Sequence, residues 1–417
     1  MLIDFTVENF RSIKEPVTLS AVAQRTRTRK EPRIIPDDEI TPPHHVDGWD
    51  FDLLPALGIF GANASGKSNV LVALSSYLHL TTPGFGLSPT VGWLQPFLLG
   101  ESPSDSPTSF QARYALGGAT YVHEVKANRA GIIHESLTYS PANTKRERLL
   151  YTRDHVGGTS KHAWTIGYHF GGPHVQFTEE LDAQITYLAV LYQLDLLLIN
   201  PIKLWLMYRD PRVVQGEWYE EASAVAGCQS PELLRRVSSI LRQFDTGVSE
   251  LRYVESRPGS GAGTHLEAVH RNNGSERVFS FNMESSGTRS LFVLACQIIR
   301  ALDYGTLLII DELGAHTHPH ITHELVRMFQ NPRTNPKRAQ LIFASHDNTL
   351  MRDHLLRRDQ IWFAEKGLNG VTKLFPLSDF KARNDTSIEW SYFYGRYGAV
   401  PVTASAEEIE TAVAAAC

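Results

Sequence analysis

A stretch of eight residues near the start of the chain has the residue types and spacing needed to hold phosphate groups. Residues 61–68 read Gly-Ala-Asn-Ala-Ser-Gly-Lys-Ser, and the glycines let the backbone curl until its N–H groups face phosphate oxygens. Lys67 would reach the β- and γ-phosphates of a nucleotide, and the Ser68 hydroxyl would ligate Mg²⁺. The residues expected to contact the nucleotide here are Gly61, Asn63, Ser65, Gly66, Lys67, Ser68 and Asn69. A chance glycine-rich turn is the alternative.

The flanking sequence supplies the context that such a loop requires. Residues 57–60, Leu-Gly-Ile-Phe, are a short apolar run of strand type, and residues 69–74, Asn-Val-Leu-Val-Ala-Leu, have the pattern of a helix opening. The N-terminus of that helix would add its partial positive charge to the phosphate site.

Two carboxylates follow a second apolar run. Residues 305–310, Gly-Thr-Leu-Leu-Ile-Ile, predict a buried parallel strand that ends in Asp311 and Glu312. Ligands of open α/β sheets bind at the carboxyl ends of such strands. We expect Asp311 to be a direct or indirect partner of Mg²⁺ and Glu312 to polarise the water that attacks the γ-phosphate. A strand that simply ends in acidic surface residues is the alternative.

Two further segments fit the same chemistry. The apolar residues 340–344 end in Ser-His-Asp, which would bring His346 to the γ-phosphate and the attacking water from a neighbouring strand. Residues 285–287, Ser-Ser-Gly, stand at the head of an apolar helix, where N–H groups and hydroxyls can face an anion. Ordinary helix capping by these small residues remains the simpler interpretation of that segment taken alone.

Composition places the chain among ordinary globular proteins. Of its 417 residues 42% are hydrophobic, and 40 Lys and Arg against 45 Asp and Glu give a formal net charge of −5, which argues against a body covered with nucleic-acid-binding charge. Two basic runs could contact a nucleic-acid backbone, although solvated loops are commoner. These runs are Arg25, Arg27, Arg29, Lys30 and Arg33, and then Lys145, Arg146 and Arg148.

Compartment and membrane association follow from two more observations. Cys228, Cys296 and Cys417 are scattered without paired spacing, so we expect neither a disulfide framework nor a cysteine zinc site. No apolar stretch is long enough to span a membrane, and the first residues lack the sections of a secretion signal. We therefore expect a cytoplasmic protein without membrane contact.

The pattern along the chain predicts four parts. Residues 1–90 form the N-terminal part of the nucleotide domain, opening with an antiparallel strand pair, and residues 91–178 form a β-rich lobe with a meander over 110–139. Residues 179–247 carry helical periodicity and form an insertion too short for a long coiled-coil arm. Residues 248–417 return through a strand hairpin, turning near Asn272-Asn273-Gly274, to the second half of the nucleotide domain.

The order of phosphate loop, Ser-Ser-Gly segment, Asp-Glu strand and His strand is that of an ABC-type ATPase. The chain resembles the ABC ATPase heads of SMC and RecF type, and looks most like small bacterial AAA ATPases that include abortive-infection proteins of the AbiL type. Further similarities, which extend the resemblance over nearly the whole chain, are Asn9-Phe10-Arg11-Ser12, Gln95-Pro96-Phe97, residues 359–363 (Asp-Gln-Ile-Trp-Phe) and residues 395–401 (Gly-Arg-Tyr-Gly-Ala-Val-Pro). The resemblance implies an α/β fold, an ABC-type P-loop NTPase head with an antiparallel β lobe and a helical insertion.

The resemblance also implies roles for residues and a partner. Ser285, Ser286 and Gly287 of one subunit, a degenerate ABC signature, would contact the γ-phosphate of ATP held by the phosphate loop of a second copy, giving a head-to-tail dimer. Gln95 would sense the metal and water, and Arg11 would approach the phosphates.

Two departures from the family pattern affect these expectations. Glu284 stands where a leucine is common, which bears on how strongly ATP closes the dimer. The loop after Asp311-Glu312 is rich in histidine where the family usually has acidic residues and leucine, although His318-Pro319 matches the subgroup. His316, His318, His320 and His323 could be metal ligands or part of an intersubunit loop.

The function expected is Mg²⁺-dependent ATP hydrolysis by a dimer that controls an effector protein, with anti-phage defence as the setting and nucleic acid as an unspecified further partner. A first alternative is an ATPase-regulated nuclease or DNA-processing protein, as in overcoming-lysogenization-defect proteins. Only about seventy residues follow His346, which is short for a separate nuclease domain. A second alternative is a nucleotide-gated scaffold without hydrolysis, which requires Glu312 to be misplaced for activating water.

Overall fold

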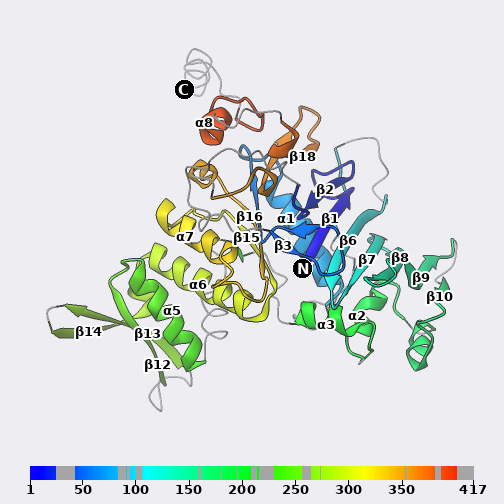
Figure 1. The fold of residues 1–417 in the computed structure, drawn as a ribbon, viewed down its shortest axis with the longest axis horizontal. Helices are drawn as coiled ribbons and strands as arrows, with labels where there is room; N and C mark the ends of the chain where they lie inside the picture. Colours follow the sequence, from blue (N-terminus) through cyan, green and yellow to red (C-terminus); the bar gives the residue numbers. More distant parts are fainter. Residues whose placement is uncertain are drawn as a thin grey trace, which may run out of the picture.

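Two large sheets with a helix between them form the framework of the protein, as the computed structural model shows (Figure 1). The structure describes the chain except residues 25–42, 83–90, 92–93, 100–105, 158–160, 180, 195, 208–213, 216–229, 256–263, 273, 353–354, 381–386 and 402–417. The basic run from Arg25 to Arg33 lies outside the described residues, as do Cys228 and Cys417. In the described part, no helix is both long and apolar enough to cross a membrane.

The first sheet is six-stranded and carries the phosphate loop. In spatial order its strands are β11 (Val214–Gln215), β15 (Leu307–Asp311), β16 (Gln340–Ala344), β5 (Ala56–Phe60), β17 (Ile361–Lys366) and β18 (Thr372–Pro376). The first five run parallel and β18 is antiparallel. Every residue of β5, β15 and β16 is buried, as expected for apolar strands with helices on both faces. The predicted buried strands are confirmed.

The second sheet is seven-stranded and antiparallel. Its order is β10 (His162–Ile166), β9 (Arg148–His155), β8 (Gly131–Pro141), β7 (Ala119–Asn128), β6 (Thr108–Leu116), β1 (Leu2–Glu8) and β2 (Val17–Ser20). Buried and partly exposed residues alternate along β7, because one face of the sheet packs on the core. The predicted meander and strand pair are both present. The first strand, however, lies inside this sheet, between β2 and β6.

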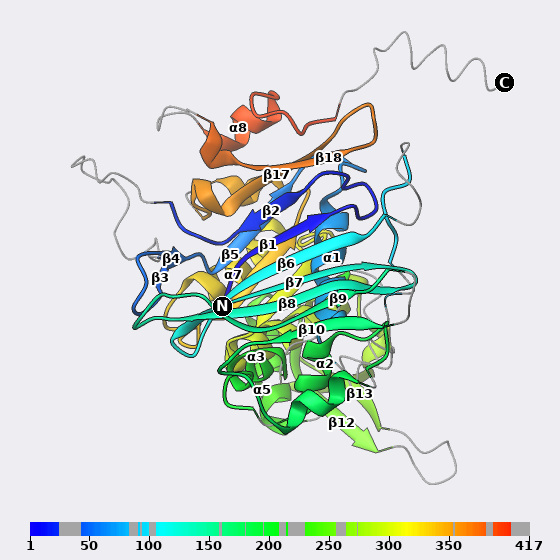
Figure 2. The same cartoon turned by 90° about the vertical axis from the view of Figure 1, so that its right-hand side faces the viewer.

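Helices fill the space between the sheets and cover the far face of the six-stranded sheet. Helix α1 (Lys67–Leu80) shares one hydrophobic core with both sheets, and α6 (Ser286–Tyr304) and α7 (Pro319–Gln330) share a second core with the opposite face of the smaller sheet. Figure 2 shows the antiparallel strands and α1 side by side. The predicted fold class, an α/β P-loop head with an antiparallel lobe, is confirmed.

A third, smaller sheet projects from this body (Figure 1). It contains β12 (Val248–Glu255), β13 (Thr264–Asn272) and β14 (Ser275–Ser280), and we call it the arm. The turn between β13 and β14 is where the sequence predicts it, and Gly274 there has a φ of 80°, a left-handed conformation that favours glycine. The hairpin expected from the sequence therefore has a third strand.

The remaining elements are short. The helices are α2 (Tyr187–Leu191), α3 (Asn200–Met207), α5 (Pro231–Gln243) and α8 (Ile388–Phe393). The 3-10 helices are Pro173–Thr178, Phe281–Met283, Asn348–Met351, Arg358–Gln360 and Leu377–Asp379. The short strand β3 (His44–His45) pairs with β4 (Asp52–Leu53). Cys296, on α6, is disulfide-bonded. The cysteine spacing, from which we expect no disulfide framework, does not predict this bond.

A buried polar network joins α1 to the antiparallel lobe. The Tyr77 hydroxyl of α1 lies 2.8 Å from Nδ1 of His123, whose Nε2 lies 3.2 Å from Oε1 of Glu135. Glu135 also accepts hydrogen bonds from the Tyr151 hydroxyl and from the backbone N–H of Tyr187, at the start of α2. Burial alone would raise the pKa of Glu135, but the hydrogen bond with His123 and the charges of His123 and Arg153 lower it.

Candidate nucleotide-binding site

The phosphate loop connects β5 to α1 and needs its glycines. Gly66 precedes the first helical residue with φ 103°, and a Cβ there would lie 2.1 Å from Oγ1 of Thr372. A Cβ on Gly61, whose φ is 155°, would lie 2.3 Å from the carbonyl oxygen of Ala364. The loop is therefore pressed against β17 and β18 too closely for any side chain at these two positions.

Lys67 lies over this loop with its ammonium group turned back on the backbone. Its Nζ donates hydrogen bonds to the carbonyl oxygens of Gly61 and Ala62, both at 2.9 Å, and the residue is only 6% exposed. Burial lowers the pKa of Lys67, while the charges of Asp311 and Glu312 act to raise it. The buried hydroxyl of Ser65 has no hydrogen-bond partner within the described structure. Both groups are therefore placed to bind an anion in the loop.

The Asp-Glu pair stands at the carboxyl end of β15. Asp311 is buried, and its Oδ1 accepts a hydrogen bond from the backbone N–H of Glu312 at 3.1 Å. Glu312 is exposed and has φ 56°, a left-handed conformation that is uncommon for a residue other than glycine. Such strain persists where the surroundings fix a side chain in a functional direction.

His346 follows β16, the strand between β15 and β5. The backbone N–H of Ser345 donates to the carbonyl oxygen of Ile59, which holds this strand end beside the start of the phosphate loop. Burial lowers the pKa of His346, the charge of Lys67 lowers it further, and Glu312 and Asp311 raise it. The structure thus brings Lys67, Asp311, Glu312 and His346 into mutual electrostatic range, as expected for parallel strands that end at one edge.

A chain of hydrogen bonds supports the loop from the side of β18. The Asn69 amide donates to Oγ of Ser12 at 2.6 Å, Ser12 lies 2.8 Å from Oγ1 of Thr372, and Thr372 donates to the carbonyl oxygen of Ser65 at 3.0 Å. The side-chain amide of Asn69 is therefore hydrogen-bonded to Ser12 in this structure. The sequence signalled Ser12 only as part of a family motif, and it gave no sign of Thr372.

Residues 395–401 brace the loop from a second direction. The backbone N–H of Ala62 donates to the carbonyl oxygen of Ala399 at 2.9 Å, which also accepts from the Tyr392 hydroxyl at 3.1 Å. Tyr392 is stacked on Phe363 of β17, with ring centroids 5.2 Å apart. Sequence reasoning assigned this segment no structural role. Its paired glycines, Gly395 and Gly398, were the available signal of a tight turn.

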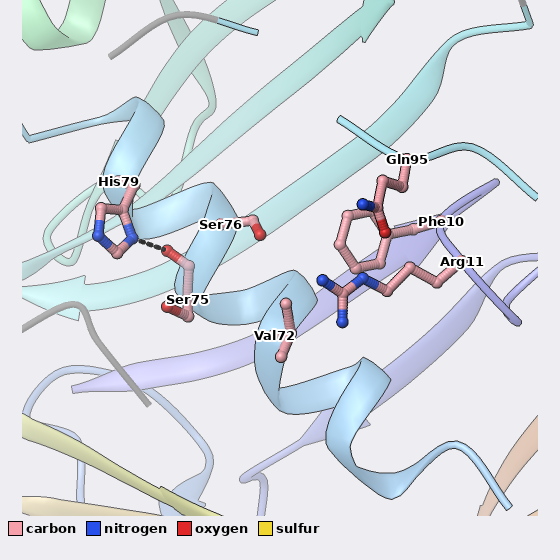
Figure 3. A pocket seen from close by; sticks show the side chains of 7 residues that line it. All are labelled: Phe10, Arg11, Val72, Ser75, Ser76, His79 and Gln95. Carbon is pink, nitrogen blue, oxygen red and sulfur yellow. Dashed lines mark hydrogen bonds between the residues drawn. The ribbon is translucent and has the colours of Figure 1, made fainter. Parts of the chain in front are cut away.

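Arg11 and Gln95 meet beside α1. The backbone N–H of Arg11 donates to the carbonyl oxygen of Gln95 at 2.8 Å, and Arg11 has φ 50°. Both residues line a cavity of about 180 Å³ together with Phe10, Val72, Ser75, Ser76 and His79, the last four on α1 (Figure 3). Burial lowers the pKa of Arg11. The structure thus joins these two predicted residues, along the flank of α1 rather than at the carboxylate pair.

The Ser-Ser-Gly segment opens α6. Ser285 is the N-cap, and its hydroxyl accepts from the backbone N–H of Thr288 at 3.1 Å, so helix capping describes its side chain here. Ser286 is exposed and Gly287 is half-buried. A Cβ on Gly287 would lie 3.1 Å from the carbonyl oxygen of His316, so this helix start adjoins the histidine-rich loop.

The histidines of that loop serve local structure. His318 caps α7 by accepting from the backbone N–H of His320 at 3.2 Å, their rings stack 5.2 Å apart, and Nε2 of His323 lies 3.1 Å from Oγ1 of Thr349. Among the described residues, no three His, Cys, Asp or Glu side chains are grouped as a metal site would require.

The sequence profile of one family matches residues 57–352, and its description is "AAA domain, putative AbiEii toxin, Type IV TA system". No curated protein matches the chain. Solved structures similar to it include two SMC heads, whose low identities and TM-scores say nothing about the role of a residue.

The first is an SMC head bound to the C-terminal winged-helix domain of ScpA, with 14% identity, a TM-score of 0.45 and coverage of 94% of this chain and 99% of that one. The second is an SMC head with an extended coiled coil bound to the C-terminal domain of ScpA from Pyrococcus furiosus. It has 11% identity, a TM-score of 0.43 and coverage of 95% and 98%.

Proposed function

Because the matched profile spans most of its length, the chain belongs to this AAA-domain family, and we propose that it hydrolyses ATP with the help of Mg²⁺. The observation that carries the proposal is the convergence of Lys67, Asp311, Glu312 and His346 at one sheet edge beside the phosphate loop. Membership of the family supports ATP-driven activity in general. The roles of the individual residues are our inference from geometry and chemistry.

The loop offers the groups that a triphosphate needs. The Lys67 ammonium would exchange the carbonyl oxygens of Gly61 and Ala62 for phosphate oxygens, and the unpartnered Ser65 hydroxyl would donate to the same anion. Asn63 and the N-terminal backbone of α1, from Lys67 to Asn69, would complete the binding surface. Since Ala62 gives its N–H to Ala399, that group is not part of the cradle.

Glu312 is the group that we propose accepts a proton from the attacking water. It is exposed, whereas Asp311 is buried, so only Glu312 is open to solvent at the end of β15. Ser68 and Asp311 would hold Mg²⁺, which neutralises phosphate charge when it is bound. His346, whose pKa is lowered by burial and by the charge of Lys67, would hydrogen-bond the γ-phosphate or the water as a sensor of the nucleotide.

We further propose a head-to-tail dimer in which Ser285, Ser286 and Gly287 complete the site of a second copy. The exposure of Ser286, next to the half-buried Gly287, at the start of a 19-residue helix supports this role, because free N–H groups there can bind the γ-phosphate. Arg11 and Gln95, which lie beside α1, would sense whether a nucleotide is bound at the start of that helix. We also propose that this dimer controls an effector protein in anti-phage defence, a setting compatible with a family description that names a toxin system.

The test is ATP turnover by the purified protein, with and without Mg²⁺ and DNA, alongside Lys67→Ala, Glu312→Gln and the surface control Lys126→Ala. We expect Lys67→Ala to lose nucleotide binding, Glu312→Gln to bind ATP and accumulate as a dimer without turnover, and Lys126→Ala to behave as wild type. Unchanged turnover in Glu312→Gln would reject Glu312 as the base. ATP binding without turnover in the wild type would favour the nucleotide-gated scaffold.

A further inference from the structure

Strand β14 is exposed to solvent along its whole length. All six of its residues, Ser275–Ser280, are exposed, and it forms one edge of the arm. Figure 1 shows it projecting away from the body of the molecule. An edge strand offers a row of backbone N–H and C=O groups to any chain that can pair with it. β14 has no proline, and its large apolar residues Val278 and Phe279 are 47% and 39% exposed.

Buried apolar residues anchor the arm that carries this edge. Leu251 of β12 and Leu266 and Ala268 of β13 are buried in one cluster with Leu234 and Val237 of α5. β13 and β14 pair in register over all six residues of β14, without a bulge. An incoming strand would therefore meet a preformed edge and would need to order only itself.

Most of the described charges of the arm are paired, and Arg277 on β14 is an exception. Glu276 of β14 accepts hydrogen bonds from Arg252 at 3.0 Å and Arg271 at 3.1 Å, and both arginines also bind Glu250. Arg277, the next residue, has no hydrogen bond or ion pair in the described part of the chain. The edge thus presents one unpaired cation followed by two exposed apolar side chains.

We propose that the edge of β14 binds an extended, acidic segment of a partner protein as an added β-strand. Backbone hydrogen bonds along the edge supply affinity, and side chains opposite β14 supply specificity. A carboxylate of the partner opposes Arg277, and apolar or aromatic residues lie beside Val278 and Phe279, which are favourable cross-strand pairs. The proposal concerns the arm alone and stands whether or not the protein hydrolyses ATP.

Charge disfavours a second copy of this chain as the added strand. Antiparallel pairing of β14 with itself about Arg277 would set two arginines opposite one another, which is destabilising. Moving the register to set Arg277 opposite Glu276 would draw Glu276 away from Arg252 and Arg271. A nucleic acid is disfavoured too, because Arg277 is the only cation on β14 and a phosphate backbone is bound through several.

The test is selection of a phage-displayed library of random peptides on the full-length protein, without nucleotide. We expect enriched peptides to alternate apolar residues around an acidic one. The best peptide, synthesised with a fluorescent label, should bind Arg277→Glu roughly three- to tenfold more weakly than wild type. The matched control Arg146→Glu, an exposed arginine on the turn between β8 and β9, should bind as wild type does. A peptide with lysine in place of its acidic residue should recover affinity for Arg277→Glu.

Strand addition has a second signature in hydrogen exchange. Backbone N–H groups within residues 275–280 should gain protection when the peptide binds, whereas binding at any other surface would leave them unchanged. Arg277→Ala, which adds no charge, should weaken binding less than Arg277→Glu does. Three results would overturn the proposal. The first is enrichment no stronger on wild type than on Arg277→Glu. The second is a self-association that Arg277→Glu abolishes, and the third is Arg277-dependent binding of an oligonucleotide in place of peptides.

Discussion

Ala62, in the phosphate loop, donates its backbone N–H to the carbonyl oxygen of Ala399 at 2.9 Å. Ala399 has φ 57°, and its own N–H is fixed by a hydrogen bond to Oε1 of Glu365 at 3.2 Å. The conformation of the loop therefore depends on a segment far away in the sequence as well as on its own glycines.

Removal of the Tyr392 hydroxyl should loosen the loop. Tyr392→Phe keeps the ring stacked on Phe363 but loses the hydrogen bond to Ala399, so we expect the free energy of unfolding to fall by about 1 kcal/mol. ATP affinity, measured by titration calorimetry, should fall as well. Tyr394→Phe is the matched control, because Tyr394 is 72% exposed. Equal ATP affinities in the two variants would show that the hydrogen bond from Tyr392 to Ala399 does not affect ATP binding by the phosphate loop.

A methyl group at Gly66 should prevent the loop from closing. In Gly66→Ala the new Cβ meets Oγ1 of Thr372 and the φ of 103° is strained for alanine, at roughly 1–3 kcal/mol. We expect ATP affinity to fall by about tenfold or more. Gly157→Ala should have no effect, since nothing lies within 4 Å of its added Cβ. Normal ATP binding by Gly66→Ala would mean that β18 can move away.

Breaking the buried network under the antiparallel lobe should destabilise the whole protein. Glu135→Gln leaves Arg153 buried with its compensating charge removed, and we expect about 3 kcal/mol of stability to be lost in urea denaturation. Glu124→Gln breaks a surface ion pair with Lys126 and should change stability by at most about 1 kcal/mol. Similar losses in both variants would contradict the importance of burial here.

Acid should act on the protein partly through His162. Burial, and then the charge of Arg153, lower the pKa of His162 from 6.5 to about 4. Between these values the unfolded chain binds the proton more readily than the folded one, so stability falls as the pH drops from 6.5 towards 4. His162→Gln removes this contribution. Melting temperatures of the variant should therefore depend less on pH over that window, and identical dependence would reject the shift.

The sequence predicts the strands and helices of the nucleotide site better than it predicts the contacts that hold them in place. The strands that end in Asp311 and His346 are recognisable because continuous apolar runs at a phosphate-binding motif have few other structures open to them. The position of β1 within the second sheet is decided by strand pairing between distant residues, which periodicity does not encode. The same holds for the bond from Thr372 to the Ser65 carbonyl, and for the disulfide of Cys296.

The supports of the phosphate loop also set an order of events during synthesis. Ser12 leaves the ribosome before the loop does, but Thr372 and Ala399 follow it by most of the length of the chain. A nascent chain that already contains β5 and α1 thus lacks the two contacts that hold Ser65 and Ala62 in place. Chains are made and fold from the N-terminus onward. The phosphate loop consequently acquires these two supporting hydrogen bonds late, once residue 399 has emerged.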